Sequence, residues 1–502
     1  MRTASSHLLF ALLLAWTPAC ARTAPTVAPA PPVAADPLAA LRAELDHLFL
    51  EPAYDHALWG VKVQSMDSGQ ILYELNPSKL MMPASNMKIV TMAAAAERLG
   101  WDYRFETRLA TSGHIESGVL HGDLIVQGTG DPTIGAEDPP DATFIAWADR
   151  LIAEGIQRID GRIIGDDNAF DDEGFGAAWS WDDIPFGYAA QSGALQFHQG
   201  IVELTINPGA AVGDAAGVSV SPPGSDLVVH GNVITGAPGD RPAVALARLP
   251  TREELDVRGT VPLDGTPIVR TASAVNPTRF FVRGLRAALI EHGVEVQGEA
   301  VDIDDIDDTG DLATDAPRVL VRHQSATLAE IGRVLMKDSQ NLYAETLLKA
   351  LGRLATGLGT ARAGREVVSA VLSGWGIPET EYVMYDGSGL SRNNYVTPDM
   401  LITLLRVIHR GAAAERFLET LPIGGVDGTL ERRLVATRAA GRVRAKTGSI
   451  ANTRALSGYL PTADDEILAF SIIANHFRLP PRVVLDRIDL AVERLVNFTR
   501  AR

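Results

Sequence analysis

The sequence predicts an α/β multidomain protein in which a β-rich region interrupts a mainly helical one. The chain has 502 residues, which indicates about three domains at roughly 150 residues per domain. From about Tyr103 to Ala316, short apolar runs alternate with Gly, Pro and Asp turns, a pattern typical of one or two inserted β-rich domains. After Val319 the apolar residues return to helical spacing.

The first residues have the pattern of an export signal. Arg2 supplies a positive charge, residues 8–16 form a short apolar run, and Ala19-Cys20-Ala21 offers a cleavage site, so residues 1–21 are predicted to be a signal peptide. Cys20 is the only cysteine, so we expect neither a disulfide nor a cysteine metal site. A small residue before a cysteine also fits a lipoprotein signal, so soluble export and a lipid anchor through Cys20 both stay open. Residues 22–37, rich in Ala and Pro, are predicted to be an extended tether.

Local patterns then predict the elements that follow the tether. Residues 38–50 have helical periodicity, and residues 59–75 alternate around Asp67-Ser68-Gly69, which predicts a β-hairpin. Residues 87–99, rich in Ala and Met, predict a helix that begins just after Pro83 and Ser85. In the β-rich region the predicted strands are residues 119–127, 162–165, 201–206, 227–234 and 243–249, and the predicted helices are 143–155 and 277–292. Further on, the predicted helices are 326–337, 341–356, 360–375, 398–410 and 481–499, and the predicted strands are 454–460 and 466–475.

The charge of the chain argues against nucleic-acid binding, and its residue spacing argues against a metal site. The formal net charge is −17, and a nucleic-acid partner would need a basic face. The acidic run from Asp302 to Asp315 lacks the ligand spacing and closing Glu of a calcium loop, so we interpret it as a surface loop. The eleven histidines show no His-Glu-x-x-His or comparable pair. We therefore expect no metal and no cofactor, and activity that survives a strong chelator.

Three short motifs contain residues suited to acyl transfer. In Ser85-Asn86-Met87-Lys88, positions i and i+3 share one face of a helix, so Lys88 can take the proton of a nucleophilic Ser85. In Ser339-Gln340-Asn341, Ser339 can relay a proton and Asn341 can hold a substrate amide, although this motif taken alone is better explained by Ser339 as a helix cap.

The third motif is Lys446-Thr447-Gly448-Ser449, beside a predicted strand. Lys446 offers positive charge, Gly448 allows close backbone approach, and Thr447 and Ser449 offer hydroxyls to a substrate carboxylate. Each motif alone also fits an ordinary turn or helix start, but this set in this order is typical of class A β-lactamases and penicillin-binding proteins. Because 254 positions separate Ser85 from Ser339, a compact β-lactamase has no room for the insert.

Beyond these motifs the chain resembles the D-alanyl-D-alanine carboxypeptidase/endopeptidase family, the low-molecular-mass class C penicillin-binding proteins. The resemblance runs from about Leu38 onward and includes three longer stretches, residues 128–133, 385–392 and 421–430. The family often has Thr at the position of Ser449, which keeps the hydroxyl. The Gly128–Gly130 pattern is followed by Pro132 and no helix, so we interpret it as a turn rather than a phosphate site.

The resemblance implies a fold and a domain order. A penicillin-binding, β-lactamase-like transpeptidase domain, with helices around an antiparallel sheet, would comprise residues 38–102 and 318–502. A second domain of residues 103–165 and 240–317 would be inserted into it, and a third domain of residues 166–239 would be inserted into the second.

The resemblance also implies an activity, that of a serine-type D-Ala-D-Ala carboxypeptidase and endopeptidase. Ser85 would form an acyl-enzyme with peptidoglycan stem peptides, Lys88 would be the base, and Lys446 would relay protons and hold substrate charge. The backbone N–H groups of Ser85 and Ser449 would form the oxyanion hole. β-Lactam antibiotics would inhibit the enzyme, and it would act in the periplasm or cell envelope.

Two other functions fit parts of the same pattern. A β-lactamase would use the same residues with rapid antibiotic turnover. A non-catalytic module that binds cell-wall peptide is disfavoured, because binding alone does not require Ser85 and Lys88. The sequence leaves the oligomeric state open.

The inserted region carries an aromatic and acidic segment, residues 179–188, with two interpretations. One is a β-turn with buried aromatic side chains. The other follows from the resemblance, which implies an insert loop that covers the substrate side chain. In that case Asp183, or next Asp182, would pair with the ammonium group of a diamino acid, and Tyr188 would add a cation–π contact. Ile450 would pack on the aliphatic part of the same side chain.

Overall fold

The computed structural model describes residues 36–54, 56–250, 252–306 and 317–500. The chain divides into Met1–Asp36 and one compact unit, Pro37–Arg502, and the fold below is that of the second. The predicted signal peptide, Cys20 and all but the last two residues of the tether lie outside the described residues, as does most of the acidic run after Ile306. None of the helices in the described ranges is long and apolar enough to cross a membrane.

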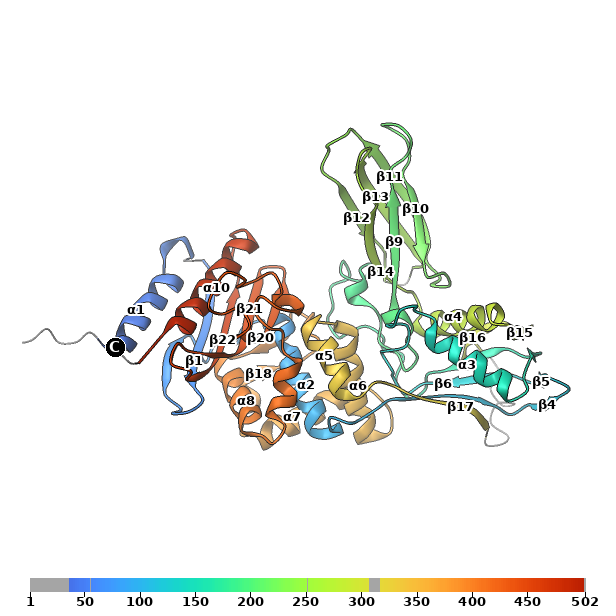
Figure 1. The fold of residues 1–502 in the computed structure, drawn as a ribbon, viewed down its shortest axis with the longest axis horizontal. Coiled ribbons are helices and arrows are strands. Elements are labelled where there is room, and N and C mark those ends of the chain that lie inside the picture. Colours follow the sequence, from blue (N-terminus) through green and yellow to red (C-terminus); the bar gives the residue numbers. More distant parts are fainter. Residues whose placement is uncertain (1–35, 55, 251, 307–316, 501–502) are drawn as a thin grey trace, which may run out of the picture. The chain divides into compact units, whose positions relative to one another are not determined.

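A five-stranded antiparallel sheet joins the two ends of the compact unit. Its strand order is β2 (Ile71–Leu75), β1 (Leu58–Ser65), β22 (Ile467–Asn475), β21 (Thr453–Pro461) and β20 (Arg444–Ile450). Val61 and Val63 pack on one face against α1 (Pro37–Phe49) and α10 (Pro481–Asn497), which lie side by side (Figure 1). This arrangement leaves β20 as an edge strand of the sheet.

The other face of the sheet packs against a helical layer. Ala469 and Ile473 of β22 belong to the same buried cluster as Met92 and Leu347. The layer contains α2 (Met87–Leu99), α5 (Leu328–Lys337), α6 (Asn341–Thr356), α7 (Ala361–Gly374), α8 (Pro398–Arg410) and α9 (Ala414–Thr420), with a small ribbon of β18 (Tyr382–Val383) and β19 (Tyr395–Val396). Helices around an antiparallel sheet are the fold that the sequence predicted.

The inserted region begins and ends in neighbouring strands. One sheet has the order β16 (Ala300–Asp302), β8 (Ile163–Asp166), β6 (Leu124–Gln127), β3 (Glu106–Thr111) and β17 (Arg318–Gln324). A second has the order β15 (Glu295–Val296), β7 (Arg158–Ile159), β5 (Val119–His121) and β4 (His114–Glu116). Helices α3 (Ala142–Ala153) and α4 (Pro277–Glu291) pack together beside them (Figure 1).

Two further three-stranded sheets complete the insert. Their orders are β10 (Gly217–Ser221), β9 (Ile201–Asn207), β14 (Ile268–Ser273), and β11 (Val228–Gly236), β13 (Glu254–Pro262), β12 (Ala243–Ala247). One buried cluster runs through the whole insert, from Leu109 and Phe281 to Leu204 and Val257. The insert therefore has a hydrophobic core of its own.

The predicted domain boundaries stay a prediction, but strand pairing bears on two of them. Strands β13 and β14, placed by the sequence in the second domain, pair with β11 and β9 of the predicted third domain, and β12 pairs with β13. Strand β17, placed in the peptidase domain, pairs with β3 of the insert. This pairing indicates that the second segment of the peptidase domain begins after Gln324 and not at residue 318. Periodicity indicates a strand but not its partner, which is why these positions differ.

Helix bounds agree closely with the predicted ones because their capping residues are local signals. Asn341–Thr356, Pro398–Arg410 and Met87–Leu99 have the predicted bounds. The Thr397 hydroxyl accepts a hydrogen bond from the backbone of α8, with Pro398 as its first residue.

Candidate active site

Ser85 lies in a tight turn just before helix α2. Residues 84–86 form a short 3-10 helix, and Ala84 has φ of 47°, a left-handed backbone that a non-glycine residue adopts only where surrounding structure holds it. Gly389 packs directly on this turn, since a Cβ on it would lie 1.9 Å from the Ala84 carbonyl oxygen. Asn86 Nδ2 donates to Ser457 Oγ of β21 at 2.7 Å. The turn is thus fixed between the sheet and the segment around Gly389.

Lys88 is fully buried, and its Nζ has three polar partners. Its Nζ lies 3.0 Å from Ser85 Oγ, 2.6 Å from Asn341 Oδ1 and 2.7 Å from the Ser388 carbonyl oxygen. Burial lowers the pKa of Lys88 from 10.5 to about 7, although the charges of Asp386 and Glu345 oppose the shift. A large fraction of Lys88 is therefore a neutral amine near neutral pH, and a neutral amine can accept the Ser85 proton.

Two carboxylates near Lys88, those of Glu345 and Asp386, were not predicted from the sequence, and their charges act to raise the pKa of Lys88. Glu345 of α6 accepts the backbone N–H groups of Gly387 and Ser388, and Asp386 accepts those of Gly389 and Ser391. Burial raises the pKa of Glu345, and the nearby Asp386 charge raises it further. These two side chains shape the loop whose Ser388 carbonyl contacts Lys88.

The second motif lies between α5 and α6 and faces both lysines. Ser339 has φ of 61°, and its Oγ accepts a hydrogen bond from Lys446 Nζ at 2.8 Å. It does not cap α6, because the cap is Gln340, whose side chain accepts from the Leu342 N–H. Asn341 uses both ends of its amide, accepting from Lys88 and donating from Nδ2 to the Tyr188 carbonyl at 2.7 Å. In this structure Asn341 therefore orients Lys88 and holds the insert.

The third motif lies on the edge strand β20. Lys446 is fully buried, and burial together with the charge of Lys88 lowers its pKa well below the usual value. A Cβ on Gly448 would lie 2.5 Å from the Pro83 carbonyl oxygen, so the close approach predicted for this glycine is found. Ala445 N–H donates to Pro422 O, away from β21. Since strands alternate with period two, the Ser449 N–H points to the same outer edge.

These three motifs line one cleft with a volume of about 560 Å³. Every site residue predicted from the sequence lines it except Lys88, Lys446 and Gly448, which are buried. The lining residues are Ser85, Asp182, Asp183, Tyr188, Ser339, Asn341, Gly389, Leu390, Arg392, Thr429, Thr447, Ser449, Ile450 and Ala451.

The insert contributes one wall of the cleft. Asp183 Oδ1 accepts a hydrogen bond from the Tyr188 hydroxyl at 2.8 Å, and burial followed by the Asp183 contact raises the pKa of Tyr188. Tyr188 stacks on Phe186 with ring centroids 5.4 Å apart. Trp181 and Tyr188 are 62% and 45% exposed, so the interpretation of buried aromatics is wrong for both. Trp179 Nε1 donates to Asp386 Oδ2 at 2.8 Å and fastens the segment to the peptidase part.

Five lining residues were not singled out from the sequence, namely Gly389, Leu390, Arg392, Thr429 and Ala451. All but Ala451 lie in two of the long stretches of family resemblance, residues 385–392 and 421–430, so that signal could have found those four. Thr429 Oγ1 accepts a hydrogen bond from Thr447 Oγ1 at 2.7 Å. Arg392 adds a positive charge at the cleft, next to the exposed Asp182 carboxylate, whose pKa is lowered first by Ser180 and to a lesser degree by this arginine.

The arrangement can perform acyl transfer. A hydroxyl lies within hydrogen-bond distance of a largely neutral amine, a second buried amine contacts a second hydroxyl, and an N–H at a strand edge faces the same cleft. A serine, two lysines and a strand-edge N–H are the groups that a serine acyl-transferase would use.

Comparisons with known proteins agree with this class. The family model described as "D-Ala-D-Ala carboxypeptidase 3 (S13) family" matches residues 41–495, and the chain belongs to this family. Because this is a family of D-Ala-D-Ala carboxypeptidases, the chain is an enzyme of that kind.

Individual relatives cover nearly the whole chain. A D-alanyl-D-alanine carboxypeptidase of Actinomadura sp. (strain R39) is 35% identical, over 90% of this chain and 84% of the relative. A penicillin-sensitive carboxypeptidase A of Dictyostelium discoideum is 27% identical, over 88% and 87%. The crystal structure of penicillin binding protein 4 from Haemophilus influenzae has a TM-score of 0.78 at 24% identity, over 90% of this chain and 98% of that one, and shows the same fold.

Proposed function

We propose that this carboxypeptidase cleaves peptidoglycan stem peptides through a Ser85 acyl-enzyme. The observation that carries the proposal is the 3.0 Å contact between Ser85 Oγ and Lys88 Nζ, together with the pKa of about 7 of that buried amine. A base whose pKa lies near the working pH combines a populated neutral form with a useful driving force for proton transfer.

In the proposed first step the Ser85 proton moves to Lys88 Nζ while Oγ bonds to the carbonyl carbon of the penultimate D-residue. The backbone N–H groups of Ser85 and Ser449 stabilise the oxyanion. The C–N bond then breaks, and the proton that Lys88 took passes to the leaving amine by way of Ser339, which is hydrogen-bonded to Lys446, so that Lys88 is neutral again. Water releases the acyl group in the second step, with Lys88 again as base.

The same serine is proposed to react with β-lactams, which would inhibit the enzyme. The name of the Dictyostelium relative, a penicillin-sensitive carboxypeptidase, supports this part of the proposal. An endopeptidase activity on cross-linked peptides is proposed as well, because the sequence resembles a carboxypeptidase/endopeptidase family. Since the substrate lies outside the cytoplasmic membrane, we propose that the protein is exported to the periplasm or cell envelope.

The proposed function is tested by incubating the protein with purified muropeptides and identifying the products by mass. Loss of a terminal D-alanine from pentapeptides, and conversion of cross-linked dimers to monomers, are the expected results. Unchanged muropeptides would contradict the proposal. Penicillin labelling that reverses within seconds, with antibiotic turnover, would favour a β-lactamase instead.

Asp183 is proposed to recognise the ammonium group of a diamino acid in the stem peptide. Its carboxylate lines the cleft and is held there by Tyr188. We expect Asp183→Ala to lower kcat/KM about tenfold or more for peptides with a free side-chain amine, because a charge-assisted hydrogen bond is lost. Acylation by benzylpenicillin, which lacks that amine, should change little.

The control for this prediction is an Nε-acetylated version of the same peptide. Wild-type protein and Asp183→Ala should cleave the acetylated peptide at similar rates. An equal loss on the amine peptide, the acetylated peptide and penicillin would mean that Asp183 supports the structure of the segment and not the substrate.

A further inference from the structure

A second group of chemically reactive side chains lies on the β4–β5 hairpin of the insert. Ser117 and Gly118 form its turn with φ of 50° and 85°, as in the tight two-residue turns that fix strand register. In that register His114 lies directly opposite His121, while Ile115 lies opposite the buried Leu120.

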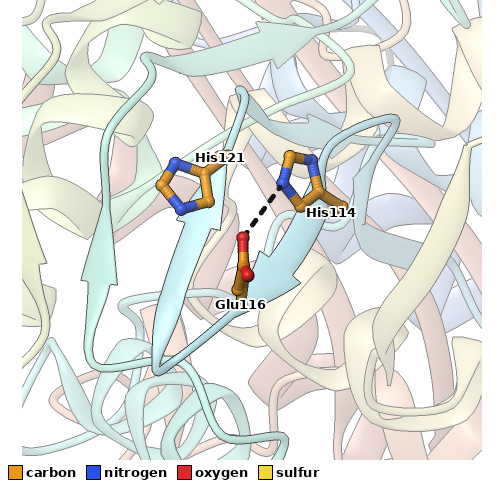
Figure 2. A group of neighbouring side chains, drawn as sticks. All are labelled: His114, Glu116 and His121. Carbon is orange, nitrogen blue, oxygen red and sulfur yellow. Dashed lines mark ion pairs between the residues drawn. The ribbon is translucent and has the colours of Figure 1, made fainter.

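Side-chain alternation places the polar groups on one face. His114 and Glu116 are two apart on β4, and His121 is across from His114, so all three project to the same side (Figure 2). One ring nitrogen of each histidine and one carboxylate oxygen lie within 4.8 Å of one another. His114 Nε2 is 4.0 Å from Glu116 Oε2, and the two imidazole rings are stacked with centroids 5.0 Å apart.

A fourth residue orients one of these histidines. Asp160 Oδ2 lies 3.0 Å from His121 Nδ1, and Asp160 is itself held by Arg158 Nε at 2.8 Å and by its backbone bond to Leu120 O. A carboxylate on one ring nitrogen fixes the tautomer that leaves the other, Nε2, free as a ligand. This carboxylate–histidine arrangement is the one that supports histidine ligands in metal sites.

From these observations we propose that His114, Glu116 and His121 bind a Zn²⁺ ion. Two imidazoles and one carboxylate are ligands that zinc accepts, with bonds of about 2.0–2.2 Å. A tetrahedral site needs ligand atoms about 3.4 Å apart. His114 and Glu116 are 73% and 72% exposed, so their side chains can close the remaining distance by rotation. Water fills the fourth position.

The proposed zinc site is separate from the peptidase cleft, since none of its ligands lines that cleft. Bound zinc would join β4 to β5 and stabilise the hairpin, because a ligand that binds only the folded state raises its stability. The expectation that acylation needs no metal therefore still stands: stripping zinc with a strong chelator should leave the rate of penicillin acylation unchanged.

The test is a calorimetric Zn²⁺ titration of the full chain without a histidine tag. Wild-type protein should bind about one equivalent, and its melting temperature should rise with zinc. His114→Ala and His121→Ala should each weaken binding more than about tenfold, and Asp160→Asn should weaken it about tenfold without removing a ligand. His230→Ala, an exposed histidine on another sheet, is the matched control and should bind as wild type does.

The proposal fails if wild-type protein binds no zinc, or if the His114 and His121 variants bind it as tightly as the His230 control. If chelation abolishes acylation by penicillin, the claim that the zinc site is separate from the peptidase cleft is wrong. Circular dichroism of each variant without zinc should match that of the wild type, since none of the substituted side chains belongs to the buried core of the insert.

Discussion

Ser85→Ala is expected to abolish covalent labelling by penicillin and to lower peptide turnover by at least about 10⁴-fold. The reason is that the variant keeps the cleft but loses the hydroxyl that lies 3.0 Å from Lys88 Nζ. Removal of a nucleophile eliminates the covalent route, and what persists is the stabilisation that the surrounding donors give to direct attack by water.

The measurement is mass spectrometry of the protein after incubation with benzylpenicillin, followed by peptide mapping. The adduct should lie on the peptide that contains Ser85. Ser373→Ala, an exposed serine on α7, is the control and should label at the wild-type rate. An adduct on Ser339 or Ser449 would show that the nucleophile has been wrongly assigned.

Lys88→Ala is expected to slow acylation about 10²–10⁴-fold, the usual contribution of a positioned base, while substrate binding weakens less.

In wild-type protein the acylation rate should also depend on pH. Because the pKa of Lys88 is lowered to about 7, its neutral form dominates above pH 7 and is lost below it. The rate should therefore fall about tenfold per pH unit below 7 and level off above it.

Stopped-flow measurement of acylation between pH 5 and 9 checks this prediction. Lys79→Ala, at an exposed lysine outside the cleft, should keep the wild-type profile. A profile in wild-type protein that stays flat through pH 7, or a Lys88→Ala variant that acylates at the wild-type rate, would rule out Lys88 as the base.

The sequence could predict the parts of this site that depend on local patterns. Ser85 and Lys88 share a helix face, and Lys446 to Ser449 follow one strand, so short-range spacing was sufficient to identify them. The partners of these residues are distant along the chain and could not be predicted in this way. Glu345 in α6 and Asp386 in a loop meet only in the folded protein, where both contact the backbone beside Lys88.

The insert shows the same limit. Its acidic and aromatic segment was recognised, but the bonds that hold it in place join residues more than 150 positions apart. Trp179 reaches Asp386, and the Tyr188 carbonyl accepts from Asn341. Likewise, a strand at residues 243–249 was predicted, but β13 and β14 were not, and their pairing with β11 and β9 depends on contacts that periodicity does not specify.

The sheet that joins the two ends of the compact unit has a consequence for the order of folding. Strand β1 pairs with β22, so Leu58 lies opposite Asn475, and this pairing needs almost the full chain. The insert's strands pair among themselves, and its core contains no residue before Leu109 or after Val321. During synthesis the insert can therefore fold first, because β1 and helix α2, which carries Lys88, complete their packing only after the last strands have been made. A chain that ended before residue 467 would have a folded insert and an unformed catalytic sheet, which would keep incomplete molecules inactive.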